Sequence, residues 1–207
     1  MIPLEALVTF ALASLLLALA PGPDNLFVLT QSALGGRLAG LAVTLGLCTG
    51  LLVHTAAVAL GVAAIFQVSA LAFTLLKLIG AGYLIYLAWQ AFRAPAAALQ
   101  GGGSAVSLGR LYRRGILMNV TNPKVSVFFL AFLPQFADPA RGPLWLQIVL
   151  LGAVFILATI VVFGAVACLA GSLGQWLGRS PGAQRIMNRL AGVVFLGLAL
   201  KLATARR

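Results

Sequence analysis

Apolar segments follow one another along almost the whole of this sequence, and each is about as long as a bilayer-spanning helix. Hydrophobic residues make up 62% of the 207 residues, charged residues make up 8%, and the mean hydropathy is +1.09. Soluble domains typically carry about 25% charged residues, so this chain has too little charge to cover a water-facing surface. At roughly 20 residues per span, the length allows about six transmembrane helices. The sequence therefore predicts an all-α integral membrane protein.

Glycine, proline and polar residues divide the apolar sequence into successive segments that we expect to be helical. The expected helices cover about residues 4–32, 39–65, 70–92, 115–136, 144–169 and 186–202. Residues 93–109 are rich in Ala, Gly and Ser and lack a helical apolar stripe, which is typical of a linker. We expect a single transmembrane domain, 1–207, with halves of about 1–92 and 110–207. Met1–Glu5 contains no basic residue, so we expect the first segment to stay as a helix and not to be cleaved as a signal peptide.

The basic residues predict how the chain is oriented in the membrane. The net charge of +11 comes from 14 Lys and Arg against 3 Asp and Glu. The connections after the first, third and fifth expected helices carry Arg37, Arg93, Arg110, Arg113, Arg114, Arg179, Arg185 and Arg189. The opposite side carries Arg141, Arg206 and Arg207, and also Lys201 if its side chain reaches the membrane surface. Cytoplasmic loops are enriched in Lys and Arg, so we expect the linker 93–109 in the cytoplasm and both termini outside. No basic stripe is present to neutralise successive phosphates, which argues against nucleic-acid binding.

Proline interrupts the first helix of each half. Pro21-Gly22-Pro23 lies inside the first expected helix, and Asn122-Pro123-Lys124 lies inside the fourth. Proline removes a backbone donor, and in hydrocarbon the freed groups need partners within the protein. Matched breaks in corresponding helices are typical of transporters whose site lies at the broken helices. The alternative is a pair of kinks used only for packing, since prolines are common in membrane helices.

Each break is followed by a charged residue, Asp24 in the first half and Lys124 in the second. A charge near the bilayer centre costs roughly 2.5–3.5 kcal/mol on insertion scales, so we expect it to be paired, to line a wet cavity or to take part in transport. The half-helix N-terminus after Pro23 favours an anion. Lys124 is a candidate to bind a substrate carboxylate, and Asp24 to bind an ammonium group or exchange a proton. Two structural alternatives stay open: a silent ion pair between the two, or Asp24 as a helix cap.

His54 and Lys77 are weaker candidates inside the apolar segments. His54 is the only histidine and can relay protons, although a hydrogen-bonded packing role is an equal alternative. Lys77 is costly at the bilayer centre, but its long side chain can reach toward the membrane surface.

Small and aromatic residues in the apolar segments have structural interpretations. Gly46 and Gly50 have the spacing of close helix packing. Tyr83, Tyr86 and Trp89 are typical of an aromatic belt at the membrane surface and not of a cofactor site. We expect no cofactor.

Three other functions fit the sequence less well than transport. A membrane thiol-redox conduit needs two thiols that can meet, and Cys48 and Cys168 lie in the expected second and fifth helices, away from the breaks. A metal-ion exporter needs more ligands than one histidine and one intramembrane aspartate. An intramembrane hydrolase needs a Ser/His, paired Asp or HExxH-like set, and the sequence has none. We therefore expect a transporter and not an enzyme.

Five stretches carry recognisable motifs: PGPDNL at 21–26, GRLAG at 36–40, LKLIGAGYL at 76–84, GILMNVTNPK at 115–124 and FFLAFLPQF at 128–136. The first two resemble the first-helix signature of the LysE/RhtB amino-acid exporters. The third resembles the third helix of that family, and the last two resemble its fourth. The resemblance covers nearly the whole chain.

The resemblance implies six transmembrane helices in two inverted three-helix repeats, with the first helix of each repeat broken. It also implies export of amino acids or close derivatives across the cytoplasmic (inner) membrane of a bacterium, against the entry of protons. Whether the exporter is a homo-oligomer stays open. The functional core that it implies contains Pro21, Gly22, Pro23, Asp24, Asn122, Pro123 and Lys124. Asn25 and Asn119 lie in the same motifs and are included as candidates.

The charges favour a neutral amino acid as the substrate. Asp24 is the one acid expected well inside the membrane, because Glu5 and Asp138 lie near helix ends. Lys77 and Lys124 would repel a basic side chain in a low-dielectric cavity. A neutral amino acid needs only an anion site for its carboxylate and an acceptor for its ammonium group.

Overall fold

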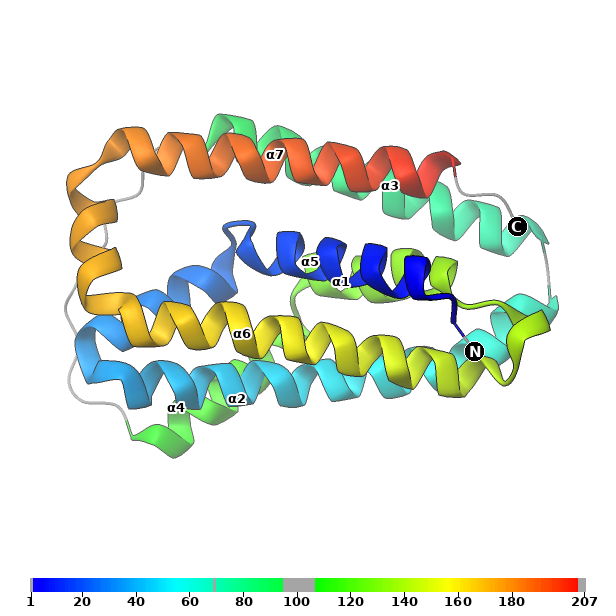
Figure 1. The fold of residues 1–207 in the computed structure, drawn as a ribbon, viewed down its shortest axis with the longest axis horizontal. Helices are drawn as coiled ribbons and strands as arrows, with labels where there is room; N and C mark the ends of the chain where they lie inside the picture. The colour runs from blue at the N-terminus through cyan, green and yellow to red at the C-terminus, as the bar shows by residue number, and fades with distance from the viewer. Residues whose placement is uncertain (1, 69, 95–106, 205–207) are drawn as a thin grey trace.

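The computed structural model describes residues 2–68, 70–94 and 107–204, and they form a helical bundle (Figure 1). The α-helices are α1 (Leu4–Leu19), α2 (Pro23–Val68), α3 (Ala70–Arg93), α4 (Leu108–Val120), α5 (Pro123–Val127), α6 (Leu144–Arg179) and α7 (Pro181–Thr204). Between α5 and α6 lie the π-helix η1 (Phe128–Phe132) and the 3₁₀-helices η2 (Leu133–Phe136) and η3 (Pro139–Arg141). No strand occurs within these ranges.

A sharp bend at Gly36 divides α2 into two helices. Its φ of 76° and ψ of 174° lie in a region that glycine alone adopts readily, because a side chain would clash there. The bend falls where the sequence predicts the turn between the first and second helices. Helix α2 extends to Val68, past the end predicted at about residue 65, and α3 begins at Ala70 as predicted.

Several predicted helix boundaries were wrong, because the helices concerned extend beyond the ends of their apolar segments. Helix α4 begins at Leu108, so Arg110, Arg113 and Arg114 lie on a helix and not in a connection. Helix α6 continues to Arg179, past the end predicted at about residue 169. Helix α7 begins at Pro181, because proline is well suited to the first turn of a helix. The apolar segment of a sequence corresponds only to the part of the helix inside the hydrocarbon core, so it does not show where the helix ends outside that core. Most of the linker, 95–106, and the terminal Arg206 and Arg207 lie outside the described residues.

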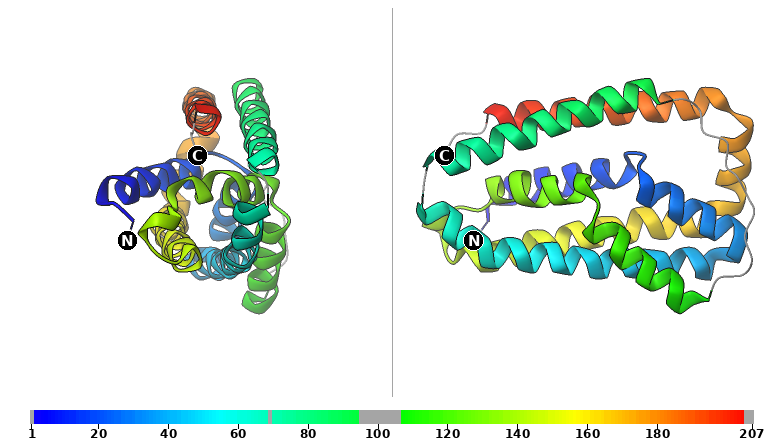
Figure 2. Two further views of the ribbon diagram at one scale, coloured as in Figure 1. Left: turned by 90° about the vertical axis from the view of Figure 1, so that its right-hand side faces the viewer. Right: turned by 180° about the vertical axis from the view of Figure 1, so that it is seen from behind.

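The helices form three layers. Helices α2, α4 and α6 pack together on one side, α1 and α5 lie in the middle, and α3 packs along α7 on the other side (Figures 1 and 2). The bend in α2 and the junction of α6 with α7 lie at one end, which we call the linker end. The N-terminus, the α2–α3 turn and the end of α7 lie at the other, which we call the terminal end.

Glycines bring α2 and α4 into close contact. A Cβ atom added at Gly46 would fall on the carbonyl oxygen of Tyr112, and one added at Gly50 would lie 2.7 Å from Cβ of Asn119. The packing role predicted for this glycine pair is therefore confirmed. It sets Asn119 of α4 against the middle of α2.

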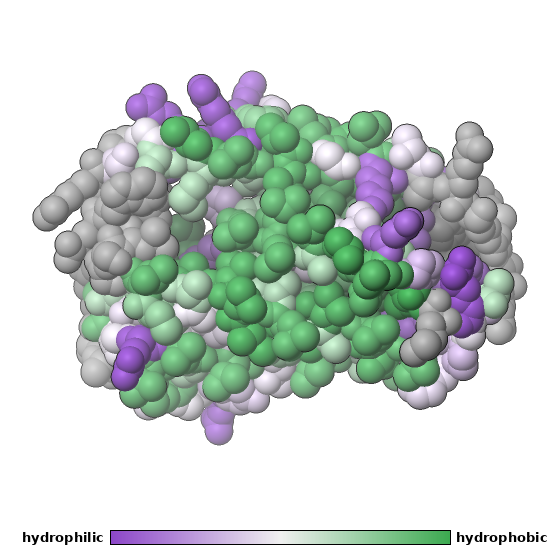
Figure 3. All heavy atoms as spheres, viewed as in Figure 1, coloured by the Kyte–Doolittle hydropathy of each residue, from purple (hydrophilic) through white to green (hydrophobic). Residues whose placement is uncertain are grey.

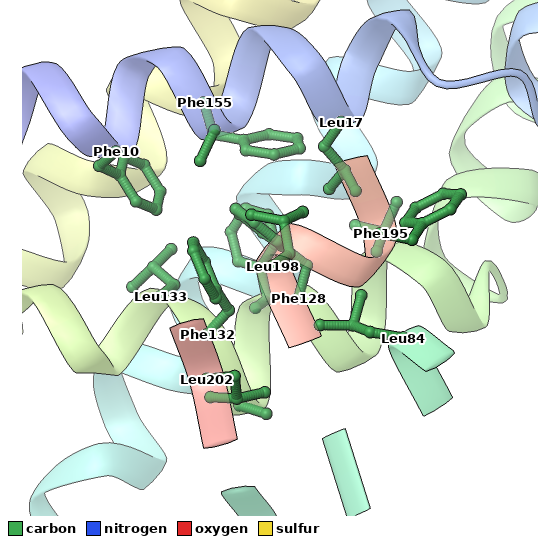
Figure 4. Close-up of a cluster of buried hydrophobic side chains, with 14 of the residues drawn as sticks. Phe10, Leu17, Leu84, Phe128, Phe132, Leu133, Phe155, Phe195, Leu198 and Leu202 are labelled. Atoms are coloured by element: carbon green, nitrogen blue, oxygen red, sulfur yellow. The ribbon is translucent and has the colours of Figure 1, made fainter. Parts of the chain in front are cut away.

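The core at the terminal end is built from phenylalanines (Figure 4). Phe10 of α1, Phe128 and Phe132 of η1, and Phe155 of α6 are all buried, and neighbouring ring centroids lie 4.8 to 5.8 Å apart. Side chains of α3 and α7 cover this cluster from the other side. It holds the middle layer to both outer layers.

Large apolar side chains cover the outside of the bundle between the polar ends (Figure 3). Soluble proteins rarely expose such a continuous apolar surface. Among the described residues, three helical stretches are long and apolar enough to cross a membrane: Pro23–Gly61, Leu144–Ala170 and Gly182–Thr204. Helix Leu108–Val120 together with Pro123–Phe136 makes a fourth if this pair, bent by 49°, is counted as one span. The protein is a helical membrane protein.

Candidate functional site

The two breaks predicted from proline meet in the middle layer of the bundle. The first separates α1 from α2 at residues 20–22, and the second separates α4 from α5 at residues 121–122. Pro23 and Pro123 are each the first residue of the helix that follows the break. At this position the backbone N–H has no partner within the helix, so its absence in proline costs no hydrogen bond. The prolines therefore act as helix starts that leave polar backbone groups inside the bundle.

Lys124 reaches from the second break to the first. Its side chain is 8% exposed, and its Nζ donates to the carbonyl oxygens of Leu17 (3.3 Å) and Ala20 (3.1 Å). These carbonyls belong to the last turn of α1, which carries the negative end of the helix dipole and has no further helical N–H groups to bind. The ammonium group thus compensates the end of α1.

Asn122 connects the second break to Asp24 of the first. Its Oδ1 accepts from the backbone N–H of Lys124 (3.0 Å) and caps α5, while its Nδ2 donates to Asp24 Oδ2 (2.9 Å). In the part of the chain that the structure describes, neither the silent Asp24–Lys124 ion pair nor the helix cap by Asp24 is found. Asp24 and Lys124 each bind groups of the opposite break instead.

Three oxygen atoms beside the breaks are buried and have no hydrogen-bond partner among the described residues: Asp24 Oδ1, Asn25 Oδ1 and Asn119 Oδ1. The Asn119 side chain lies next to the Asp24 carboxylate. An unpaired buried polar atom costs about 1–3 kcal/mol, and such atoms point to a functional role when several occur together.

His54 of α2 lies beside these buried polar side chains. Its Nε2 donates to the carbonyl oxygen of Asn119 (3.1 Å), and its ring lies 5.6 Å from that of Phe129, measured between centroids. Because a carbonyl can only accept, the proton lies on Nε2. Lys77 lies on α3 and is not one of the residues that line the cavity described next.

A cavity of about 710 Å³ lies between the breaks and the α3–α7 layer. The wall on the side of the breaks is formed by Pro21, Gly22, Pro23, Asn122, Pro123 and Lys124. The space-filling view shows the molecule hollowed near its linker end (Figure 3). Phe195 lines the cavity and also belongs to the buried hydrophobic cluster that contains the phenylalanines (Figure 4).

The predicted site residues therefore separate into two groups. The proline-containing segments and Lys124 face the cavity, whereas Asp24, Asn25 and Asn119 lie behind that wall. Asp24 is 3% exposed and accepts a hydrogen bond from Asn122, which lines the cavity.

The opposite wall was missed by the sequence analysis. Tyr83, Tyr86 and Gln90 of α3 line it, together with Gln184 and Asn188 of α7. Two of these were interpreted only as parts of a membrane-surface belt. Their positions, 83, 86 and 90, follow the helical spacing of a single face, and this polar stripe was the signal that could have found them.

The described residues contain no cluster of three or more His, Cys, Asp or Glu side chains suited to a metal ion. Cys48 on α2 is buried, Cys168 on α6 is exposed, and both thiols are free. Neither lines the cavity.

Comparison with known proteins gives the family. The model of the family described as LysE type translocator matches residues 15–206. An uncharacterized membrane protein of Vibrio cholerae is 39% identical over 95% of this chain and 96% of its own length. A homoserine/homoserine lactone efflux protein of Salmonella typhimurium is 37% identical, with 95% of each chain covered. No solved structure matches. The chain therefore belongs to the LysE-type translocator family.

Proposed function

We propose that this protein exports neutral amino acids or their close derivatives, and that the cavity at the two breaks holds the substrate. The observation that carries the proposal is the buried ammonium of Lys124 in the cavity wall. Two of its three hydrogens are directed to Leu17 and Ala20, so the third is available to a carboxylate or carbonyl oxygen of a substrate.

The similarity to homoserine/homoserine lactone efflux proteins supports substrates of this size and charge. Homoserine and its lactone share an α-ammonium group and a carbonyl group, although the lactone has no free carboxylate. A single ammonium donor such as Lys124 can bind the oxygen of either. A lysine substrate would bring a second positive charge into a cavity that no acidic side chain lines.

Asp24 is the proposed site of proton exchange. Its buried position behind Asn122 keeps it out of direct contact with a substrate, and its unpaired Oδ1 can accept a proton without losing a hydrogen bond. The bond from Asn122 couples this carboxylate to the wall that holds Lys124. Loading of a proton at Asp24 and release of substrate at Lys124 can therefore be linked through one amide side chain.

We propose six membrane spans in two inverted repeats, with the linker end in the cytoplasm. Support comes from the matched positions of Pro23-Asp24 and Pro123-Lys124 at the starts of α2 and α5. The cavity extends to Ala94, directly after α3, and to Gln184 of α7, toward the linker end. In this arrangement the cavity faces the cytoplasm, as an exporter about to bind its substrate requires.

Transport by reconstituted vesicles tests the proposal. Vesicles loaded with labelled homoserine, threonine, leucine or lysine are diluted into medium of the same or lower pH. We expect release of the first three to accelerate when the outside is acidic, because inward proton flow drives the exchange. Transport of lysine alone would contradict the substrate assignment, and release that is indifferent to the pH gradient would contradict proton coupling.

A further inference from the structure

An amino-acid substrate brings an ammonium group into the cavity, and no carboxylate is there to receive it. The chain has 3 acidic residues. Glu5 is exposed in the first turn of α1, and Asp138 is bound to Arg141 at 3.1 Å near the terminal end. Asp24 is buried behind Asn122. The ammonium must therefore be held by neutral groups of the wall.

The α3 wall opposite the breaks offers two aromatic rings. Tyr83 and Tyr86 both line the cavity, and their ring centroids lie 5.9 Å apart at an interplanar angle of 44°. Gln90 Nε2 donates to the Tyr86 hydroxyl at 2.5 Å, which fixes the orientation of that ring. The faces of tyrosine rings carry negative potential and attract cations, more strongly where water is excluded.

We propose that Tyr83 and Tyr86 form the subsite for the ammonium group of the substrate. The inference rests on the proposed function of the same cavity and adds the orientation of the substrate within it. The carbonyl or carboxylate lies toward Lys124 at the breaks, and the ammonium lies across the cavity against the tyrosine rings. This orientation separates the ammonium of the substrate from that of Lys124, which would otherwise repel it.

Ring-preserving and ring-removing variants test the subsite. Tyr83→Leu and Tyr86→Leu should each raise KM for homoserine by about tenfold, because a partly desolvated cation–π contact of roughly 1–2 kcal/mol is lost. Tyr83→Phe and Tyr86→Phe keep the ring and should stay within about threefold of the wild type. All variants are compared at equal amounts of monodisperse protein, so that a folding defect is not counted as lost affinity.

The chain supplies a matched control. Tyr112 is the third and last tyrosine, lies on α4 outside the cavity, and shares a hydrogen bond with Thr49. Tyr112→Leu should leave KM for homoserine unchanged. Trp89 is not a suitable control, because its ring stacks on that of Tyr86 at 6.1 Å between centroids.

A substrate analogue separates ammonium recognition from cavity shape. 4-Hydroxybutanoate is homoserine without its amino group, and its inhibition constant should be the same in the wild type and the Tyr→Leu variants. An equal loss of affinity for both compounds would overturn the subsite, and so would Phe variants as impaired as the Leu variants. Unchanged KM in the Leu variants overturns the subsite alone. A wild type that transports no amino acid overturns both the subsite and the proposed function.

Discussion

Lys124 occupies a position that would be strongly unfavourable without the end of α1. A buried ammonium needs partners for its hydrogens, and the carbonyls of Leu17 and Ala20 supply two of them. Gly22 provides the space, since a Cβ atom added there would lie 3.2 Å from Lys124 Nζ. The first break thus provides both the carbonyl oxygens that accept hydrogen bonds from Lys124 and the space that its side chain occupies.

Replacement of Gly22 by alanine should therefore reduce transport. The added methyl group crowds Lys124 Nζ, and we expect it to shift the ammonium and raise KM for homoserine severalfold. Gly82→Ala is the matched control, because nothing lies within 4 Å of a Cβ atom at that glycine of α3. Equal kinetics for the two variants would show that the position of Lys124 is not critical.

Asp24→Asn tests coupling and not binding. Asparagine keeps an oxygen that can accept from Asn122 Nδ2, so the fold and the wall should be preserved. It cannot exchange a proton, and the pH gradient should therefore cease to accelerate homoserine release. Counterflow of labelled against unlabelled homoserine, which needs no gradient, should persist. A variant still driven by an acidic exterior would place the proton site elsewhere.

At the level of the elements, the close approach of α2 and α4 determines where the buried polar residues His54 and Asn119 meet. Gly46 lies against the carbonyl of Tyr112, and Gly115 of α4 lies in turn against α2. Asn119 follows one turn after Gly115, and His54 follows Gly46 two turns later. The glycine contact therefore brings His54 and Asn119 into hydrogen-bonding range.

Gly46→Ala should destabilise this crossing. The new methyl group would fall on a backbone carbonyl that cannot move as a side chain can, and overpacking of this kind typically costs about 1–3 kcal/mol. We expect a lower apparent melting temperature in detergent. Gly164→Ala of α6, with nothing within 4 Å, is the control and should melt like the wild type. Coincident melting curves would show that the two helices can separate without penalty.

The elements also show what could be predicted from sequence. Prolines, glycines at turns and isolated charges act locally, so both breaks and the Gly36 bend could be located. The π-helix at Phe128–Phe132 could not, because its register depends on rings packed from α1 and α6. The spacing of residues 83, 86 and 90 predicts that they share one helix face, but that face lies opposite the breaks only because α3 packs along α7.

For the whole molecule, the proposed orientation places the open end of the cavity in the cytoplasm. The arginines at the linker end set this orientation by their excess over those at the terminal end. A reporter active only in the cytoplasm should be active when inserted within 94–108 and silent when fused after Arg207. The reverse pattern would show that the cavity faces the outside, and it would contradict the proposal that the cavity is open to cytoplasmic substrate.

Lys124 is central to the proposed function, as the cation of the cavity that binds the substrate. The direct measurement is homoserine transport by vesicles carrying Lys124→Gln, with Lys201→Gln as the control, since Lys201 lies outside the cavity over the ring of Phe136. A hydrogen bond to a charged group contributes about 1.5–3 kcal/mol, so Lys124→Gln should lower kcat/KM by roughly ten- to a hundredfold. The control should transport like the wild type. Wild-type kinetics in folded Lys124→Gln protein would contradict the central claim.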